Sequence, residues 1–194
     1  DITIRARDLQ VSDAVIDFVG AVSGIVASTE NSGTGNSGNI NIETERLRVF
    51  DGGQILTSAF SNGEAGNINI SSSEVEVTGV SNDNNFVSRI AALSESNLKA
   101  GTVNINTNNL RVENTAEINV GNQGSGNAGN LNVIADNLFL NNQGSLQAEV
   151  NGGEKGNINL NISDSVILRN SSSIFANATG ASSGGNINID SPVI

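Results

Sequence analysis

The stretch Gly66-Asn67-Ile68-Asn69-Ile70 decides how this chain folds, because near-copies of it recur along all 194 residues. Further copies occupy residues 38–42, 101–105, 129–133, 156–160 and 185–189, and residues 2–4 form a degenerate seventh copy. Aligned on their first apolar residue, the copies are 38, 28, 35, 28, 27 and 29 residues apart. A repeat of this period is typical of a solenoid, in which each unit packs on its two neighbours.

Each of the six full units contains three apolar-x-apolar triplets, which in the third unit are residues 68–70, 75–77 and 90–92. Alternation with period two places the outer residues of a triplet on one face and the middle residue on the other. No apolar residue recurs at helical spacing, and glycine interrupts every unit, which argues against helices. We therefore predict an all-β, parallel β-helix (β-solenoid) with three short strands per coil. Coils of 27–29 residues, two of them longer, start near residues 1, 38, 66, 101, 129, 156 and 185.

Each residue of the repeated motif has an expected role in this solenoid. The isoleucines build the interior, the glycine turns the chain, and both asparagines point outward on one face. Asparagines stacked one coil apart are predicted to form hydrogen-bonded ladders. We interpret these rows as structural, with a ligand-binding stripe as the alternative. On the second strands, Arg48, Glu76 and Arg111 are expected to pair across adjacent coils.

The composition excludes several partners. The net charge is −11, with nine basic and 20 acidic residues, which argues against binding nucleic acid or anionic lipid. The chain lacks cysteine, so it has neither a disulfide framework nor a thiolate site. No run of 18 apolar residues occurs, and the opening DITIRARDLQ is not a basic-then-apolar leader. We expect no membrane insertion and interpret the chain as a mature or excised fragment.

Two insertions interrupt the regular spacing between the second and third triplets. This spacing is six residues in four coils, but 14 in the first coil and 13 in the third. The insertions, residues 12–24 and 78–89, are expected to leave the same corner of the rod. Insertions on one face of a solenoid are often recognition sites. The candidate recognition residues are Phe18, Asp83, Asn84, Asn85 and Phe86, with packing of these loops against the rod as the structural alternative.

The sequence gives no support for catalysis or for a metal site. Parallel β-helices also include polysaccharide lyases and hydrolases, but His, Tyr and Trp are absent here and the carboxylates are scattered. The glycine- and aspartate-rich calcium signatures are absent as well. We therefore predict a non-enzymatic protein with no catalytic, cofactor-binding or metal-binding residue.

The repeat resembles that of filamentous-haemagglutinin-like exoproteins of the two-partner secretion type. The resemblance rests on Gly-Asn-Ile-Asn-Ile, on a Leu-x-Val seven residues later, on the corner Asp51-Gly52-Gly53-x-Ile55, and on Ser/Asn/Gly-rich turns such as residues 61–66. It implies a right-handed β-helical stalk, exported through an outer-membrane partner barrel and displayed on Gram-negative bacteria for adhesion, aggregation or biofilm formation. The Asn-Pro-Asn signature of that family's secretion domain is absent, and the single proline is Pro192. The resemblance therefore implies a downstream stalk segment.

We accordingly expect a rigid, non-catalytic display segment of a secreted bacterial surface adhesin or filament. Its implied partners are the outer-membrane secretion barrel of the parent protein and a glycan or protein receptor. A carbohydrate-binding or carbohydrate-active β-helix is one alternative. The other is a self-assembling fibre or surface-layer component that grows by head-to-tail association of unpaired strand edges.

Overall fold

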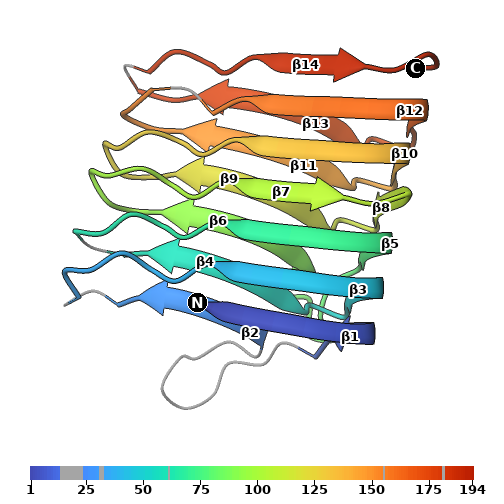
Figure 1. Ribbon diagram of the computed structural model, residues 1–194. Coiled ribbons are helices and arrows are strands. Elements are labelled where there is room, and N and C mark those ends of the chain that lie inside the picture. The colour runs from blue at the N-terminus through green and yellow to red at the C-terminus, as the bar shows by residue number, and fades with distance from the viewer. Residues whose placement is uncertain (14–23, 31–32, 61, 155, 181) are drawn as a thin grey trace.

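The computed structural model describes the whole chain except residues 14–23, 31–32, 61, 155 and 181, and its described part contains two parallel sheets. The first sheet contains β1 (Ile2–Val11), β3 (Ile40–Phe50), β5 (Ile68–Thr78), β7 (Val103–Asn106), β8 (Asn109–Glu113), β10 (Leu131–Asn141), β12 (Ile158–Leu168) and β14 (Ile187–Asp190). The second contains β2 (Gly24–Thr29), β4 (Gln54–Ala59), β6 (Arg89–Ser94), β9 (Glu117–Asn122), β11 (Ser145–Val150) and β13 (Ser173–Ala178). Successive coils stack along one axis (Figure 1), so the predicted parallel β-helix is confirmed.

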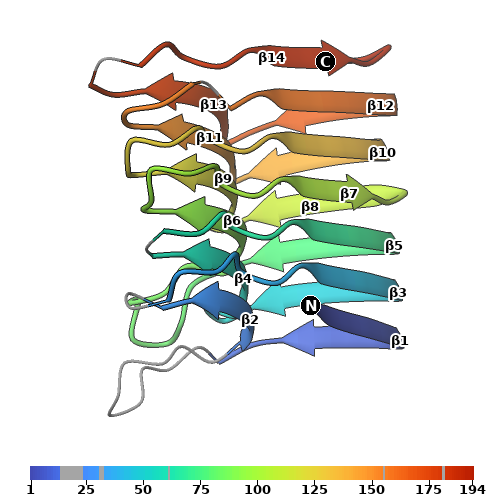
Figure 2. The ribbon, with the colours of Figure 1, turned by 60° about the vertical axis from the view of Figure 1, so that its left-hand side comes forward.

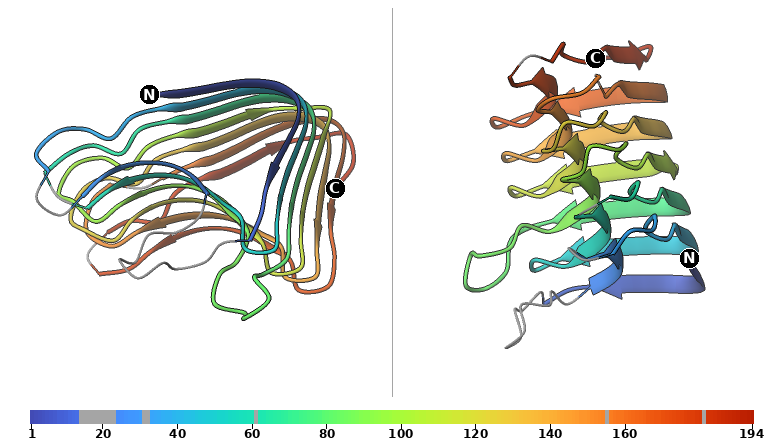
Figure 3. Two further views of the ribbon diagram at one scale, coloured as in Figure 1. Left: turned by 90° about the horizontal axis from the view of Figure 1, so that it is seen from below. Right: turned by 90° about the vertical axis from the view of Figure 1, so that its left-hand side faces the viewer.

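The two sheets form the walls of a short rod. Figure 2 shows the strands of each sheet rising one above another from the N-terminal coil to the C-terminal coil. In the end-on view from the N-terminal side, the chain runs clockwise as it recedes from the viewer (Figure 3, left). The β-helix is therefore right-handed, as the resemblance implied.

The interior of the rod is built from stacked aliphatic side chains. Ile40 pairs with Ile2 on one side and with Ile68 on the other, so equivalent residues lie in register. In the third coil Ile68, Val75 and Ile90, one from each triplet, are all 0% exposed. Burial contributes roughly 0.8 kcal/mol per CH₂ group, so every added coil extends the same favourable core.

The first and second predicted strands are one continuous strand in five coils, which corrects the expectation of three separate short strands. β3 runs unbroken from Ile40 to Phe50 and covers both triplets. Its buried residues are Ile40 and Ile42 before the bend and Leu47 and Val49 after it, so the inward parity changes within the strand. The backbone stays extended through this corner and keeps pairing with its neighbours. Only the fourth coil is divided, into β7 and β8.

Tight turns join the second and third triplets in the four regular coils. Each turn has two consecutive residues with positive φ, namely Asp51–Gly52, Asn114–Thr115, Asn142–Gln143 and Asn170–Ser171. In the first of these turns the Gly53 N–H donates to the Phe50 carbonyl at 2.9 Å. This is the geometry of a type I′ turn, which favours Asn, Asp and Gly. The turn explains the regular spacing of six residues.

The glycine of the repeated motif, which is predicted to turn the chain, does not adopt positive φ, and its missing side chain permits stacking. Among the described residues, the glycines with positive φ are Gly52, Gly79 and Gly180, all outside the motif. A Cβ on Gly101 would lie 1.9 Å from the Gly66 carbonyl oxygen, and one on Gly129 would lie 1.8 Å from that of Gly101. A side chain at this position would collide with the coil beneath.

Candidate functional site

The asparagine rows are engaged in the rod itself, as the structural interpretation predicts. The second asparagine of each motif copy belongs to a row that we call the inner row, in which five Nδ2 groups, from Asn69 to Asn188, donate to the Oδ1 of the preceding coil at 2.8–2.9 Å. The members are Asn41, Asn69, Asn104, Asn132, Asn159 and Asn188. In the neighbouring row, the Asn67 backbone N–H donates to Asn39 Oδ1 at 2.8 Å, and other coils repeat this contact. These amides stabilise the contact between coils.

The predicted charge ladder on the second strands is confirmed at one step and wrong at the next. Arg48 Nε donates to Glu76 Oε2 at 2.8 Å, as expected. Arg111 instead donates from Nη2 to Oε1 of Glu113, two residues along its own strand, at 2.7 Å. Its guanidinium also lies 4.7 Å from the centre of the Phe139 ring in the next coil. Glu76 binds Arg48, and the partners of Arg111 are Glu113 on the same strand and the Phe139 ring in the next coil.

The insertion at residues 78–89 forms a small hairpin at the corner of the rod. Val80 and Val87 make an isolated antiparallel bridge, and the Ser81 N–H donates to the Phe86 carbonyl at 2.7 Å. Phe86 is half-buried, while Asp83, Asn84 and Asn85 are exposed. The other predicted recognition residue, Phe18, lies outside the described residues.

Asp83 orders this hairpin. Its carboxylate accepts hydrogen bonds from the Ser81 hydroxyl, from the Asn85 N–H at 3.1 Å and from Asn85 Nδ2 at 2.7 Å. These bonds, the one from Ser81 foremost, hold the pKa of Asp83 below its ordinary value. Three of the five predicted recognition residues therefore lie together at the tip, and the backbone of the fourth, Phe86, is hydrogen-bonded to Ser81. Asn84, with φ of +57°, lies between Asp83 and Asn85, which are hydrogen-bonded to each other.

A larger concave site, absent from the sequence-based prediction, lies on the outer face of the second sheet. This outer groove, of about 600 Å³, crosses β2, β4, β6, β9 and β11. Its floor includes Val26, Leu56, Phe60 and Leu93. Leu56 is the middle residue of its triplet and faces outward, yet it is only 6% exposed. The signal in the sequence was the run of apolar middle residues Val26, Leu56 and Ala91 in three consecutive coils.

A polar network closes one side of the outer groove. Arg89 donates from Nε to Gln54 Oε1, and its Nη1 lies 3.8 Å from Glu117 Oε1. Gln54 Nε2 in turn donates to the Val87 carbonyl of the hairpin at 2.6 Å. Burial raises the pKa of Glu117 and lowers that of Arg89, while their mutual attraction opposes both shifts. The Arg89–Glu117 pair has no net charge. Because Arg89 bonds to Gln54 and Gln54 bonds to Val87, this network links the groove to the hairpin.

Asn119 and Gly121 shape the centre of the outer groove. Asn119 Nδ2 donates to Gln147 Oε1 at 3.2 Å, whereas its Oδ1 is shielded from solvent and has no hydrogen-bond partner among the described residues. Gly121 is paired with Leu93 on one side and Glu149 on the other. A Cβ on Gly121 would lie 3.3 Å from that Oδ1 and 3.6 Å from a Leu93 methyl. Gly121 therefore lines the groove without a side chain that would cover it.

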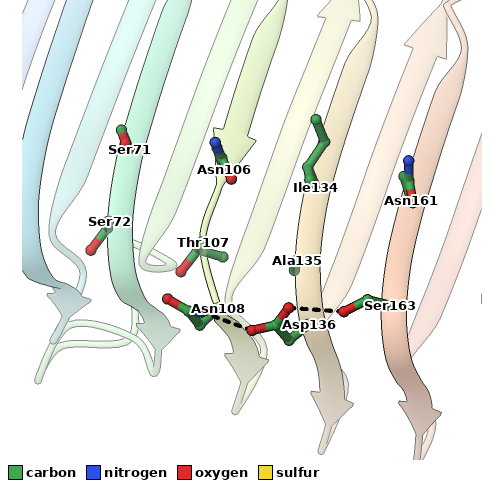
Figure 4. Close-up of a pocket in the computed structure, with 10 residues that line it drawn as sticks. All are labelled: Ser71, Ser72, Asn106, Thr107, Asn108, Ile134, Ala135, Asp136, Asn161 and Ser163. Carbon is green, nitrogen blue, oxygen red and sulfur yellow. Dashed lines mark hydrogen bonds between the residues drawn. The ribbon is translucent and has the colours of Figure 1, made fainter.

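A second, smaller pocket of about 230 Å³ lies at the bend of the first sheet. Figure 4 shows Asp136 at its edge, where the carboxylate accepts hydrogen bonds from Asn108 Nδ2 at 2.7 Å and from the Ser163 hydroxyl at 2.8 Å. Both bonds, that of Asn108 first, lower the pKa of Asp136. Asp136 thus links three successive coils, and this pocket contributes to the contact between coils.

The described part of the chain shows no group of three or more His, Cys, Asp or Glu residues that could hold a metal ion. Nor does that part contain a helix long and apolar enough to cross a membrane. Comparisons with protein-family models, with curated proteins and with solved structures found no match to the chain. The candidate sites therefore rest on the geometry alone.

Proposed function

We propose that this chain is a rigid, non-catalytic display segment of a secreted bacterial surface protein, an adhesin or a filament. The observation that supports this most directly is the continuous parallel pairing of the stack. Strands of each coil pair in parallel with those of the next from β1 to β14, with one register shift between Ala135 and Asn137 where β10 pairs with β12. A rod stabilised at every step resists bending, and it holds whatever is attached to its end at a fixed distance.

The outward side chains support the same role. The inner asparagine row, the Arg48–Glu76 pair and Asp136 all bond to neighbouring coils. The resemblance of the repeat to two-partner secretion exoproteins supplies the cellular setting of the proposal. In that setting the chain is exported through an outer-membrane barrel and displayed outside the cell. The absence of cysteine suits this route, because no disulfide has to form during passage.

Surface display in a Gram-negative host tests this proposal. The chain would be fused behind the secretion domain of a two-partner exoprotein, with a peptide epitope at its C-terminus, and co-expressed with the partner barrel. We expect an antibody to the epitope to label intact cells, and added protease to remove the label. Cells without the barrel are the matched control and should remain unlabelled. An epitope that is reached only after lysis in both strains would contradict the proposal.

A further inference from the structure

The outer groove combines exposed apolar side chains with a concave shape. Val26 is 36% exposed and Phe60 is 38% exposed, and Leu93 lies half-buried beside them in the same groove. On the first sheet, by contrast, Asn69 and Glu76 are polar middle residues that bond to a neighbouring coil. Apolar area in a concave surface favours a partner with an apolar body.

The rim of the groove is acidic. Glu30, Glu95 and Glu149 line it, and none of them forms an ion pair among the described residues. Glu30 accepts a hydrogen bond from the Ser28 hydroxyl at 3.1 Å. The basic residue of the groove, Arg89, is compensated by Glu117. The rim therefore has a net negative charge, which favours a cationic partner.

The unused hydrogen-bonding capacity of the groove is that of an acceptor. Asn119 Oδ1 is shielded from water and has no donor among the described residues, and the Glu95 and Glu149 carboxylates can only accept. Ligand N–H groups therefore find acceptors at the Glu95 and Glu149 carboxylates. Gly121, between Leu93 and Glu149, has no side chain to cover this part of the groove.

We infer that the outer groove binds an extended segment of another protein that carries apolar side chains alternating with lysine or arginine. Apolar side chains pack over Phe60 and Leu93, and the cationic groups lie against the carboxylates of Glu95 and Glu149. Ligand N–H groups donate to the same carboxylates. This inference does not depend on the proposed display function, since a groove on any rod would bind in this way.

Fluorescence anisotropy with a labelled peptide tests the inference. The probe is acetyl-Leu-Lys-Leu-Lys-Leu-Lys-amide at low salt, with Ser-Lys and Leu-Glu peptides of the same length as comparisons. We expect the Leu-Lys peptide to bind more tightly than either. Glu95→Gln/Glu149→Gln should weaken binding about three- to thirtyfold, because two exposed ion pairs together contribute up to roughly 2 kcal/mol. Gly121→Val, which places a side chain in the groove, should weaken it as well.

The matched control removes two carboxylates outside the groove. Glu64→Gln/Glu154→Gln changes the net charge equally, and both residues are exposed, so binding should stay within about twofold of the unsubstituted chain. Circular dichroism and thermal unfolding establish that each variant folds. Equal loss in both double variants, or equal binding of the Ser-Lys peptide, would reduce the effect to general charge attraction and overturn the inference. Failure of the Leu-Lys peptide to bind, or preference for a neutral oligosaccharide, would also overturn it.

Discussion

At Gly129, the absence of a Cβ atom allows two coils to approach each other closely. A Cβ at this position would meet the Gly101 carbonyl oxygen at 1.8 Å, and the backbone itself would have to shift to relieve that contact. The same contact recurs at Gly66, Gly156 and Gly185, at 1.6–2.3 Å. Because the neighbouring atom is backbone, no rotamer change can relieve the clash. Loss of this glycine therefore affects stacking itself.

Gly129→Ala is accordingly expected to lower the free energy of unfolding by about 1–3 kcal/mol, the usual cost of overpacking. The matched control is Gly35→Ala, because a Cβ there meets nothing within 4 Å, and it should change stability by no more than about 0.5 kcal/mol. Urea unfolding followed by circular dichroism measures both. Equal stability of the two variants would show that the coils can separate at this contact without cost.

The roles of asparagine and glycine in one motif were predictable to different degrees. The outward direction of Asn69 follows from strand alternation alone, so the ladder could be predicted from the period. The need for Gly129 arises from the distance to a carbonyl 28 residues earlier, and spacing in the sequence does not specify that distance. Similarly, the two partners of Arg111 depend on side-chain reach. The contacts of Gly129 and of Arg111 were not predicted because both involve a neighbouring coil.

The hairpin between β5 and β6 is the element in which a single carboxylate organises a turn. Asp83 accepts two hydrogen bonds from Asn85 and one from Ser81. The sequence indicated the position of this insertion through the spacing of the triplets. It also identified the polar cluster, but its internal hydrogen bonds became evident only in the structure. The outer groove was not predicted, because it forms only where Leu56, Leu93 and Gly121, which come from three different coils, lie on one face of the second sheet.

The stability of this hairpin should depend on pH in the acid range. The pKa of Asp83 is lower in the folded hairpin than its unfolded value of about 3.9. Its stabilising effect is therefore fully present above the unfolded value, and it is lost as the pH falls through the lower folded value. Ser81→Ala removes the largest cause and should raise the pKa of Asp83 toward its ordinary value. NMR titration of the side-chain carboxyl carbon measures this change.

Ser163→Ala is the matched control for that titration, because it removes a hydroxyl donor from Asp136 instead. We expect it to raise the pKa of Asp136 and to leave that of Asp83 unaltered. An Asp83 titration that is the same with and without the Ser81 hydroxyl would contradict the assigned cause of the shift.

At the scale of the whole molecule, the rod is a series of equivalent layers. Most contacts of a coil are with the coil before it and the coil after it, as the pairing of β3 with β1 and β5 illustrates. Stability in such a stack is approximately a sum over layers and over interfaces between neighbours. The sequence predicted this architecture because copies of the motif recur at a nearly regular spacing. The continuous bend of β3 was less evident, since two triplets seven residues apart look like two strands.

Deleting residues 129–155 should therefore leave a folded, shorter rod, because it joins Ala128 to Gly156 and removes one complete coil. Small-angle X-ray scattering should show a length reduced by about 4.8 Å, the spacing of neighbouring strands. Deleting residues 142–155 is the control, since it removes β11 but keeps β10 and so breaks the stack. We expect that variant to lose cooperative unfolding. Equal disruption by both deletions would refute the layered description.

The inner asparagine row also gives the rod a direction. From Asn69 to Asn188, each Nδ2 donates toward the N-terminal coil, and from Asn41 to Asn159 each Oδ1 accepts from the C-terminal side. The side-chain amide dipoles therefore add head to tail, with the positive end at Asn41 and the negative end at Asn188. The row therefore has a small net dipole that is aligned with the axis of the rod. A second rod stacked head to tail in the same direction would continue this alignment, whereas a rod stacked in the opposite direction would place like ends of the row together.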